Sequence, residues 1–400
     1  MKAVVVEAKW DPRPDYPLSD WERETGKAIT GSSIWRQPRF SIQEVPDPTP
    51  GPDEVVIRVK ACGVCGSDLH FYETDPEGYI LYPGLVKFPV IPGHEFSGEV
   101  VAVGKEVRDL RPGDMVTSEE MLWCGVCTPC RSGFFNHCTN LEELGFTVPG
   151  AMAEYVAVKA KYCWKINAIA ERYGDVDKAY EAGSLVEPTS VAYNGIFVRA
   201  GGFRPGAYVA VFGAGPIGLA AIALSRAAGA GKVIAFDVSA PRREMARRMG
   251  ADIALDPREV APSEAVRELT RGEGADLFVE AAGAPTRTLP EMEKALAING
   301  RIVVIGRAAE RVPLYLETLQ VRRGQIFGSQ GHSGDAIFPS VIRMMAAGLI
   351  DMTRIITARY PLDRAVEAVE RLSRRLDAKI TIKPDLREVP QVEPAAATVA

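Results

Sequence analysis

A glycine-rich turn in the second half of the chain constrains the fold more than any other feature. The sequence Gly213-Ala-Gly215-Pro216-Ile217-Gly218 follows an apolar run at residues 208–212 and precedes an alanine-rich stretch that suits a helix. In that context the glycines predict the strand, turn and helix of a dinucleotide-binding unit. The alternative is a glycine-rich turn that holds no ligand.

Each residue of this turn has a predicted role. Gly213 permits the tight turn, Gly215 lets a pyrophosphate approach the backbone, and Gly218 lets the helix pack against the strand. Pro216 and Ile217 begin the helix, whose N-terminus would face the phosphates.

The choice of cofactor depends on the end of the next apolar run. Asp237 follows residues 232–236 and would accept hydrogen bonds from the adenosine ribose hydroxyls. Its charge would repel a 2′-phosphate, so NAD is predicted rather than NADP. Arg242 and Arg243 lie close enough in sequence to weaken that preference.

The alternation of segments around the turn predicts the fold class, α/β. Apolar runs at 208–212, 232–236, 275–280 and 301–305 alternate with helical stretches, which indicates a doubly wound parallel sheet to about residue 328. The first 185 residues are expected to be mostly β with long loops. Helices near 338–347 and 362–372 and a strand at 378–383 should follow. The Pro/Ala-rich residues 389–400 are expected to be disordered.

Size and charge exclude several classes of protein. Four hundred residues, 46% of them apolar, favour two or three globular domains. The formal net charge is −5 and the basic residues are scattered, which argues against a nucleic-acid or membrane-surface protein. We see no apolar run of membrane-spanning length and no signal peptide, so a cytoplasmic location is expected.

Four of the seven cysteines form a cluster, Cys124, Cys127, Cys130 and Cys138. The short gaps let four thiolates surround one ion tetrahedrally. A closed shell of four sulfurs leaves no open position, so the cluster predicts a structural zinc. The alternatives are unligated thiols or an iron–sulfur cluster.

A second set of potential metal ligands is of mixed type. Cys65, His94 and a carboxylate, either Glu95 or Glu187, would hold zinc and leave one position open, as a catalytic site needs. The alternatives are a redox pair of Cys62 with Cys65 and a satisfied core histidine at position 94. No thioredoxin-like pattern surrounds the two cysteines, which weakens the redox alternative.

In this order, these constellations resemble the zinc-dependent medium-chain alcohol dehydrogenase family over almost the whole chain. Gly93-His94-Glu95-x-x-Gly98, followed by Gly104 and Val107, matches the family's zinc signature, and the four-cysteine lobe matches as well. The resemblance implies a GroES-like β-barrel catalytic domain at 1–188 and 329–400, with a structural-zinc lobe at 118–140. It also implies a Rossmann NAD-binding domain at 189–328 and a homo-oligomer, a tetramer or a dimer.

The polyol branch of the family offers the closer resemblance. Glu187-Pro188 stands where the alcohol-oxidising branch has a third cysteine ligand, as in sorbitol and threonine dehydrogenases. Several stretches also resemble bacterial dehydrogenases of inositol breakdown that act on scyllo-inosose: 9–14, 77–84, 119–124, 183–194 and 328–334.

The resemblance implies an oxidoreductase that passes hydride from a secondary hydroxyl of a cyclic polyol or its ketone to NAD. A linear polyol or L-threonine is the alternative substrate. A different class, a non-catalytic NAD-binding sensor stabilised by zinc, would need the catalytic-zinc ligands to be missing, and they are present.

The family also implies roles for the residues near Cys65. Zinc would act as a Lewis acid on the substrate hydroxyl, Ser67 would accept the hydroxyl proton and His70 would pass it to solvent. Asp68 would orient the imidazole of His94. Glu95 and Glu187 both remain candidates for the third ligand position.

One position predicts a polar substrate. Counted back from Cys124, Glu120 lies where related alcohol dehydrogenases have an apolar wall, and a carboxylate there would accept hydrogen bonds from a polyhydroxylated ring. The alternative is that Glu119 and Glu120 form a solvated surface pair. Further pocket candidates are Tyr79, Tyr82, Trp123, Asn194 and His332. The segment 11–39 is longer than in typical relatives and would cap the active site or form a subunit contact.

Overall fold

The computed structural model describes residues 1–307 and 311–388, and the expected disorder of 389–400 falls outside them. The chain divides into two compact units. Unit 1 comprises Met1–Val116, Glu143–Lys161 and the chain from Ile356 onward, and unit 2 comprises Thr117–Glu142 and Tyr162–Ile355. Within the described ranges, no helix is both long enough and apolar enough to cross a bilayer.

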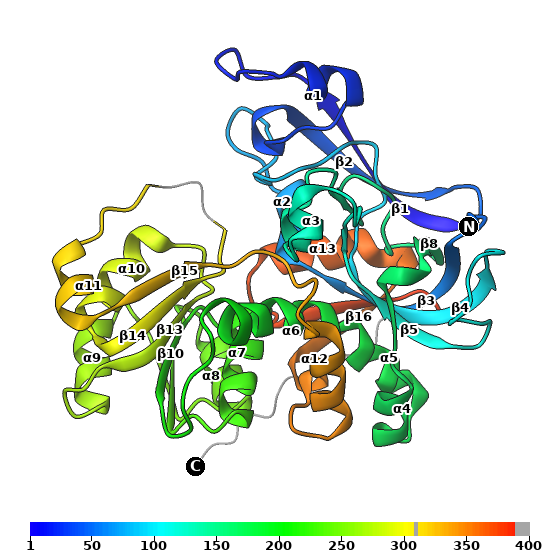
Figure 1. Cartoon of the computed structure of the whole chain (residues 1–400). Coiled ribbons are helices and arrows are strands. Elements are labelled where there is room, and N and C mark those ends of the chain that lie inside the picture. Colours follow the sequence, from blue (N-terminus) through cyan, green and yellow to red (C-terminus); the bar gives the residue numbers. More distant parts are fainter. Residues whose placement is uncertain (308–310, 389–400) are drawn as a thin grey trace. The chain divides into compact units, whose positions relative to one another are not determined.

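Unit 2 is built on a six-stranded parallel sheet (Figure 1). The strand order is β12-β11-β10-β13-β14-β15, so the direction of winding reverses between β10 and β13, as in Rossmann folds. The strands are β10 (Tyr208–Phe212), β11 (Lys232–Phe236), β12 (Ile253–Leu255), β13 (Ala275–Glu280), β14 (Leu296–Val304) and β15 (Gln325–Gly328). The predicted doubly wound parallel sheet is confirmed.

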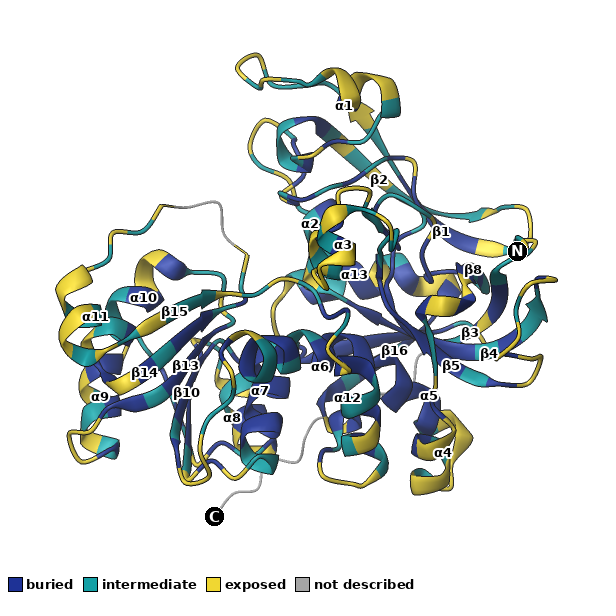
Figure 2. Cartoon of the chain, in the orientation of Figure 1, coloured by how far each residue is buried: buried dark blue, intermediate teal, exposed yellow. Residues whose placement is uncertain are grey.

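Helices connect these strands, and the strands β10, β11 and β13 are largely buried between them (Figure 2). They are α7 (Pro216–Ala227), α8 (Ala240–Arg248), α9 (Pro262–Leu269), α10 (Pro285–Lys294) and α11 (Leu316–Arg322). Phe212 and Phe236 stack in the core with ring centroids 4.6 Å apart, and Phe278 packs beside them.

Helices α4 (Asn167–Tyr173) and α5 (Val176–Ser184) of unit 2 were not expected, because the first 185 residues were predicted to be mostly β. The same unit contains α6 (Val186–Tyr193), the π-helical turn η4 (Asn194–Arg199) and α12 (Ile337–Ala346), and α12 confirms the helix expected near 338–347. Helix α12 packs on α4 and α6, and α6 packs on α7. These contacts join 162–188 and 329–355 to the parallel-sheet unit, whereas the expected boundaries assigned them to the β domain.

The rest of unit 2 is the cysteine lobe and short connecting elements. These are β6 (Met121–Leu122), α3 (Thr128–Arg131), η2 (Phe135–His137), β9 (Cys163–Lys165) and η5 (Met352–Ile355). The turn η3 (Ala160–Tyr162) lies where the chain passes from unit 1 back into unit 2. The pairing partner of β6 is β7 (Glu142–Glu143).

Unit 1 is mostly β. Its main sheet has the order β16-β17-β3-β4, with β8 also paired to β3 and β5 next to β4. The strands are β3 (Glu54–Val64), β4 (Glu95–Val103), β5 (Met115–Ser118, at whose end the chain enters unit 2), β8 (Tyr155–Lys159), β16 (Ile356–Pro361) and β17 (Lys379–Lys383). Helix α2 (Gly66–Tyr72) packs on α13 (Ala365–Ser373), which follows the turn η6 (Leu362–Arg364).

The N-terminal segment differs from the expected loops around a short strand near 40–45. Strand β1 (Lys2–Trp10) pairs along its length with β2 (Trp35–Glu44), and helix α1 (Asp20–Thr25) and turn η1 (Gly31–Ser33) lie between them. Ser19 begins α1 with a capping box, in which its side chain accepts from Glu22 N and Glu22 bonds back to Ser19.

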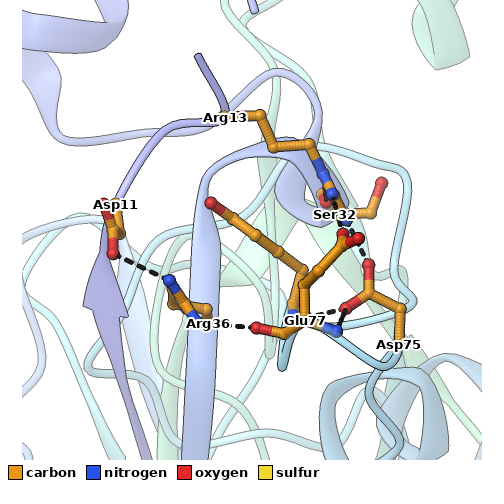
Figure 3. A network of polar contacts seen from close by, with 7 residues as sticks. Asp11, Arg13, Ser32, Arg36, Asp75 and Glu77 are labelled. Atoms are coloured by element: carbon orange, nitrogen blue, oxygen red, sulfur yellow. Dashed lines mark hydrogen bonds and ion pairs between the residues drawn. The ribbon is translucent and has the colours of Figure 1, made fainter.

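Charge-assisted bonds attach this segment to the rest of unit 1 (Figure 3). The guanidinium of Arg13 bonds to Asp75 and to Glu77, the latter at 2.5 Å, and lies 3.9 Å above the ring centroid of Tyr79. Arg36 donates to Glu77 O at 2.7 Å. The stretches 9–14 and 77–84, which both carry the resemblance to inositol-pathway enzymes, therefore meet here.

Candidate functional site

Cys65, His94 and Glu95 come together in unit 1, with their ligand atoms all within 4.8 Å of one another. Cys65 is the N-cap of α2, directly after β3, and Glu95 is the first residue of β4. The antiparallel register of β3 and β4 places Glu95 opposite Gly63, which brings the two ends together. Sulfur, imidazole nitrogen and carboxylate oxygen form a donor set that zinc accepts, so these residues fit the metal.

Asp68 joins the two segments that carry these ligands. Its Oδ2 accepts a hydrogen bond from Cys65 N at 2.8 Å, and its Oδ1 accepts one from Gly93 N at 3.3 Å. The Nδ1 of His94 lies 4.0 Å from Asp68 Oδ1. Burial raises the pKa of Asp68. The orientation of His94 by Asp68 stays a prediction.

The two predicted proton-relay residues lie on α2. Ser67 Oγ is shielded from solvent and has no hydrogen-bond partner within the described part of the chain. The backbone oxygen of His70 accepts from Leu81 N at 2.9 Å and from Tyr82 N at 3.2 Å, which places His70 beside the stretch 77–84. The proton transfer itself stays a prediction.

Lys379 belongs to this site and was missed from the sequence. It is fully buried on β17, bonds through Nζ to Glu95 Oε2, and donates to Val64 O at 3.2 Å. Gly63 makes room for the contact, because a Cβ there would collide with the Glu95 carboxylate. Lys379 is one of two lysines in the strand Lys379–Lys383, and the sequence does not show which acid Lys379 meets.

A second polar cluster lies in unit 2 and contains Glu120, Glu187 and His332, all of them buried. His332 Nε2 is 3.1 Å from Glu187 Oε1 and 3.5 Å from Glu120 Oε2. Burial lowers the pKa of His332, but its contacts with Glu120 and Glu187 outweigh that effect and raise it to about 10. The two predicted carboxylate ligands, Glu95 and Glu187, thus lie in different units, and both remain candidates.

The alternative of a solvated pair at positions 119 and 120 is wrong, because both side chains are buried. Glu119 accepts hydrogen bonds from the indoles of Trp123, at 3.1 Å, and Trp164, at 3.0 Å. Each oxygen of Glu119 therefore accepts a hydrogen bond from a tryptophan of the same unit.

Three further pocket candidates, Tyr82, Trp123 and Asn194, contact other residues of their own units. Tyr82 packs on Phe146 with centroids 5.0 Å apart, and Trp123 packs on Phe135 at 4.5 Å. Asn194 bonds to the backbone of the loop that carries His332.

The four clustered cysteines hold their sulfurs within 4.8 Å of one another. Backbone N–H groups donate to the sulfurs of Cys124 and Cys138, and such contacts stabilise thiolates. Backbone hydrogen bonding lowers the pKa of Cys127 to about 5. None of the seven cysteines, all of which lie in the described ranges, forms a disulfide. The lobe therefore fits one zinc ion.

Replacing Cys130 by serine is expected to release that zinc and to destabilise the lobe, because bound metal contributes directly to folding free energy. Metal analysis should show one zinc fewer per chain, and thermal unfolding should begin at a lower temperature. The matched control is Cys163→Ser, a partly exposed thiol outside both ligand sets. An unchanged zinc content in Cys130→Ser would contradict the prediction.

The geometry of the glycine turn suits a dinucleotide. Gly213 has φ +91°, and a Cβ there would lie 2.7 Å from Ala282 N. A Cβ on Gly218 would collide with Gly213 O. At Gly215 a Cβ would meet no atom of the described chain within 4 Å, so the backbone is open to a ligand. Gly215 caps α7, and Pro216 and Ile217 form its first turn.

Asp237 lies beside this turn, at the carboxyl end of β11. Its Oδ2 accepts from Ala214 N and its Oδ1 from Ser239 N, both at 2.7 Å. Arg243 donates to Asp237 O and to Asp256, so its charge is partly neutralised. Arg242 is half-buried on α8.

Two family models match most of the chain. Residues 51–168 match the alcohol dehydrogenase GroES-like domain, and residues 216–347 match the zinc-binding dehydrogenase domain. The chain therefore belongs to the zinc-dependent medium-chain alcohol dehydrogenase family. This confirms the GroES-like plus Rossmann fold class and an enzyme that acts on CH–OH groups.

Two named relatives match this chain over most of its length. Scyllo-inosose 3-dehydrogenase of Thermotoga maritima is 50% identical over 383 residues, 93% of this chain and 96% of the relative. L-Threonine 3-dehydrogenase of Symbiobacterium thermophilum is 35% identical over 354 residues, 88% and 96% of the two chains. A solved structure of an alcohol dehydrogenase candidate from Thermotoga maritima superposes with a TM-score of 0.92 and 48% identity, covering 96% of this chain and 99% of the other.

Proposed function

We propose that the protein oxidises a secondary hydroxyl of a cyclic polyol or its ketone, scyllo-inosose in particular, and passes the hydride to NAD in inositol catabolism. The main support for a polyol substrate is the buried polar cluster of Glu120, Glu187 and His332. This cluster offers hydrogen bonds to substrate hydroxyls, whereas a pocket for a simple alcohol would present an apolar wall. The 50% identity to scyllo-inosose 3-dehydrogenase supports the ring substrate.

The proposed site residues have separate roles in metal binding and in proton transfer. Cys65, His94 and either Glu95 or Glu187 would hold the catalytic zinc, and Cys124, Cys127, Cys130 and Cys138 the structural one. A bound catalytic zinc supplies Lewis acidity that lowers the pKa of the substrate hydroxyl. Ser67 Oγ accepts the hydroxyl proton, and the imidazole of His70 passes it on to solvent.

The cofactor is held by the turn 213–218 and by Asp237. The open backbone at Gly215 takes the pyrophosphate, and the α7 N-terminus stabilises its charge. Asp237 accepts from the ribose hydroxyls and disfavours a 2′-phosphate, so NAD is preferred to NADP, while Arg242 contributes from α8.

Asp237→Ser is expected to weaken this preference. Losing the ribose contacts should raise the KM for NAD about 10-fold or more, corresponding to at least about 1.4 kcal/mol, while activity with NADP rises. Steady-state kinetics with both cofactors measure the change, and Glu244→Gln on the exposed face of α8 is the matched control. A wild-type enzyme that already prefers NADP would contradict the role given to Asp237.

The substrate proposal is tested by the formation of reduced cofactor with scyllo-inosose, myo-inositol, sorbitol and L-threonine, each with NAD and with NADP. A rate confined to scyllo-inosose with NAD is expected. Activity on L-threonine is the second candidate, favoured by the 35% identity to L-threonine 3-dehydrogenase, and would retain the machinery but change the substrate. Two zincs per chain with no activity on any of the four would overturn the pocket assignment.

Assembly and location complete the proposal. We propose a homo-tetramer, with a dimer as the alternative, as the family resemblance implies, and a cytoplasmic location. The small-molecule substrate is the only other partner proposed. Light scattering behind size-exclusion chromatography distinguishes the two assemblies.

A further inference from the structure

The loop after β15 holds His332 between two carboxylates. Only 1% of the residue is exposed, and its Nε2 faces Glu187 at 3.1 Å and Glu120 at 3.5 Å. The ring of Phe338 packs against the imidazole, with centroids 5.2 Å apart. His332 is therefore fixed in one orientation and offers a ring N–H to acids on two other segments.

The backbone of this loop is held from two sides. Asn136 accepts through Oδ1 from His332 N at 3.0 Å and from Ser333 N at 2.8 Å, and donates through Nδ2 to Ser333 O at 3.2 Å. Asn194 donates to Gln330 O at 3.1 Å and to Gly331 O at 2.8 Å.

The approach of the loop to the cysteine lobe is close. Gly331 has φ +70°, and a Cβ there would collide with Met121 Sδ and Asn136 Oδ1. Asn136 lies in η2, between Cys130 and Cys138, so the folding of the lobe fixes its position. Glu120 directly precedes β6 of the same region.

We propose that Glu120 and His332 form a pair that recognises substrate hydroxyls, and that the cysteine lobe holds this pair in place. Asn136 of the lobe is the positioning residue, because it fixes the backbone at His332. The proposal rests on the function proposed above and names how its polyol specificity arises. The carboxylate accepts a hydrogen bond from one ring hydroxyl, and the imidazole N–H donates to its neighbour. A substrate without one of these hydroxyls leaves a buried polar group unpaired.

The chemistry of neighbouring hydroxyls matches the pair. Each hydroxyl donates once and accepts readily, so two adjacent hydroxyls satisfy a carboxylate and an imidazole together. The separation of 3.5 Å between His332 Nε2 and Glu120 Oε2 is at the outer limit of a direct hydrogen bond, so Glu120 can accept from a ligand hydroxyl at little cost. The N–H of His332 Nε2 lies nearer to Glu187, at 3.1 Å, and a ligand hydroxyl must share it with that carboxylate.

The test compares scyllo-inosose with an analogue that lacks one hydroxyl next to the carbonyl. Both are measured by kcat/KM and by calorimetric binding to the enzyme–cofactor complex, which reports recognition without turnover. His332→Gln and Glu120→Gln are expected to raise KM and Kd for scyllo-inosose about 10- to 100-fold and to change the values for the analogue little. The zinc content should stay at two per chain.

The variants at Asn136 separate positioning from general damage. Asn136→Ala should reproduce part of the His332→Gln effect, and the two changes should not be additive when combined. Asn136→Asp keeps the oxygen that accepts from His332 N and Ser333 N but loses the bond to Ser333 O, so it should restore part of the binding. His137→Ala, exposed in the same short turn, is the matched control.

Two results would overturn the inference. One is an unchanged preference between the two substrates in His332→Gln, whether or not both bind more weakly, and the other is full additivity of the Asn136 and His332 changes. If Asn136→Ala does not fold, the comparison of Asn136→Asp with His332→Gln still decides. A wild-type enzyme inactive on ring substrates would instead refute the proposed function, and the ring-specific inference with it.

Discussion

His94→Gln is expected to lose dehydrogenase activity by about 10³-fold or more, because a catalytic zinc supplies several kcal/mol of transition-state stabilisation. His94 lies with Cys65 and Glu95 in a set whose ligand atoms are within 4.8 Å of one another, and removing its imidazole leaves too few ligands to retain the ion. The measurements are kcat/KM and the zinc content, which should fall by one per chain while the four-cysteine site keeps its metal.

The control for this prediction is His137→Gln, which removes an exposed histidine outside both ligand sets. It should leave activity and zinc content unchanged. Full activity in His94→Gln with one zinc lost would show that the unit 1 set does not hold the catalytic metal. Full activity with no zinc lost would remove His94 from the ligand set altogether.

Lys379→Met is expected to lower the free energy of unfolding by about 3–5 kcal/mol, because breaking a buried pair leaves the other charge uncompensated. Lys379 and Glu95 are 0% and 1% exposed, so water cannot replace the lost partner. Denaturant unfolding measures the change. In zinc-free protein, where metal binding makes no contribution, the double variant with Glu95→Gln should recover most of the loss, since it removes the stranded carboxylate.

A surface pair in the same unit gives the contrast. Lys159 and Asp53 are 2.9 Å apart, and their side chains are about half exposed, so Lys159→Met should cost less than about 1 kcal/mol. Gly63→Ala tests the geometry of the buried pair, because its methyl group would push the Glu95 carboxylate away from Lys379. Equal stability losses in Lys379→Met and Lys159→Met would contradict the assignment.

The strands of the parallel sheet could be predicted well from the sequence. β10, β11 and β13 have the expected bounds, because strands buried on both faces are continuous apolar runs between glycines and polar residues. The short helices α4 and α5 were missed, since their stability comes from packing on α12 and η5 rather than from a long periodic pattern. For α1 the signal was present, as Ser19 and Glu22 have capping-box spacing.

The residues of the candidate site, like the elements of the fold, could be predicted from the sequence only in part. Local motifs indicated Cys65, His94 and the cysteine lobe, since their spacing along the chain carries the chemistry. Lys379 and Glu95 are 284 positions apart, and only the pairing of β17 with β3 shows that they meet. The roles of Glu119 and Asn136 likewise depend on contacts with Trp164 and with the loop at Ser333, which no local pattern indicates.

The order of strands in unit 1 has a consequence for how the protein is made. β17, near the end of the chain, lies between β16 and β3, so the ribosome must synthesise past residue 383 before the sheet can close. Until then Glu95 has no counter-ion, and the edge of β3 that receives β17 is open. A nascent chain is thus exposed to edge-to-edge association at this strand until late in translation.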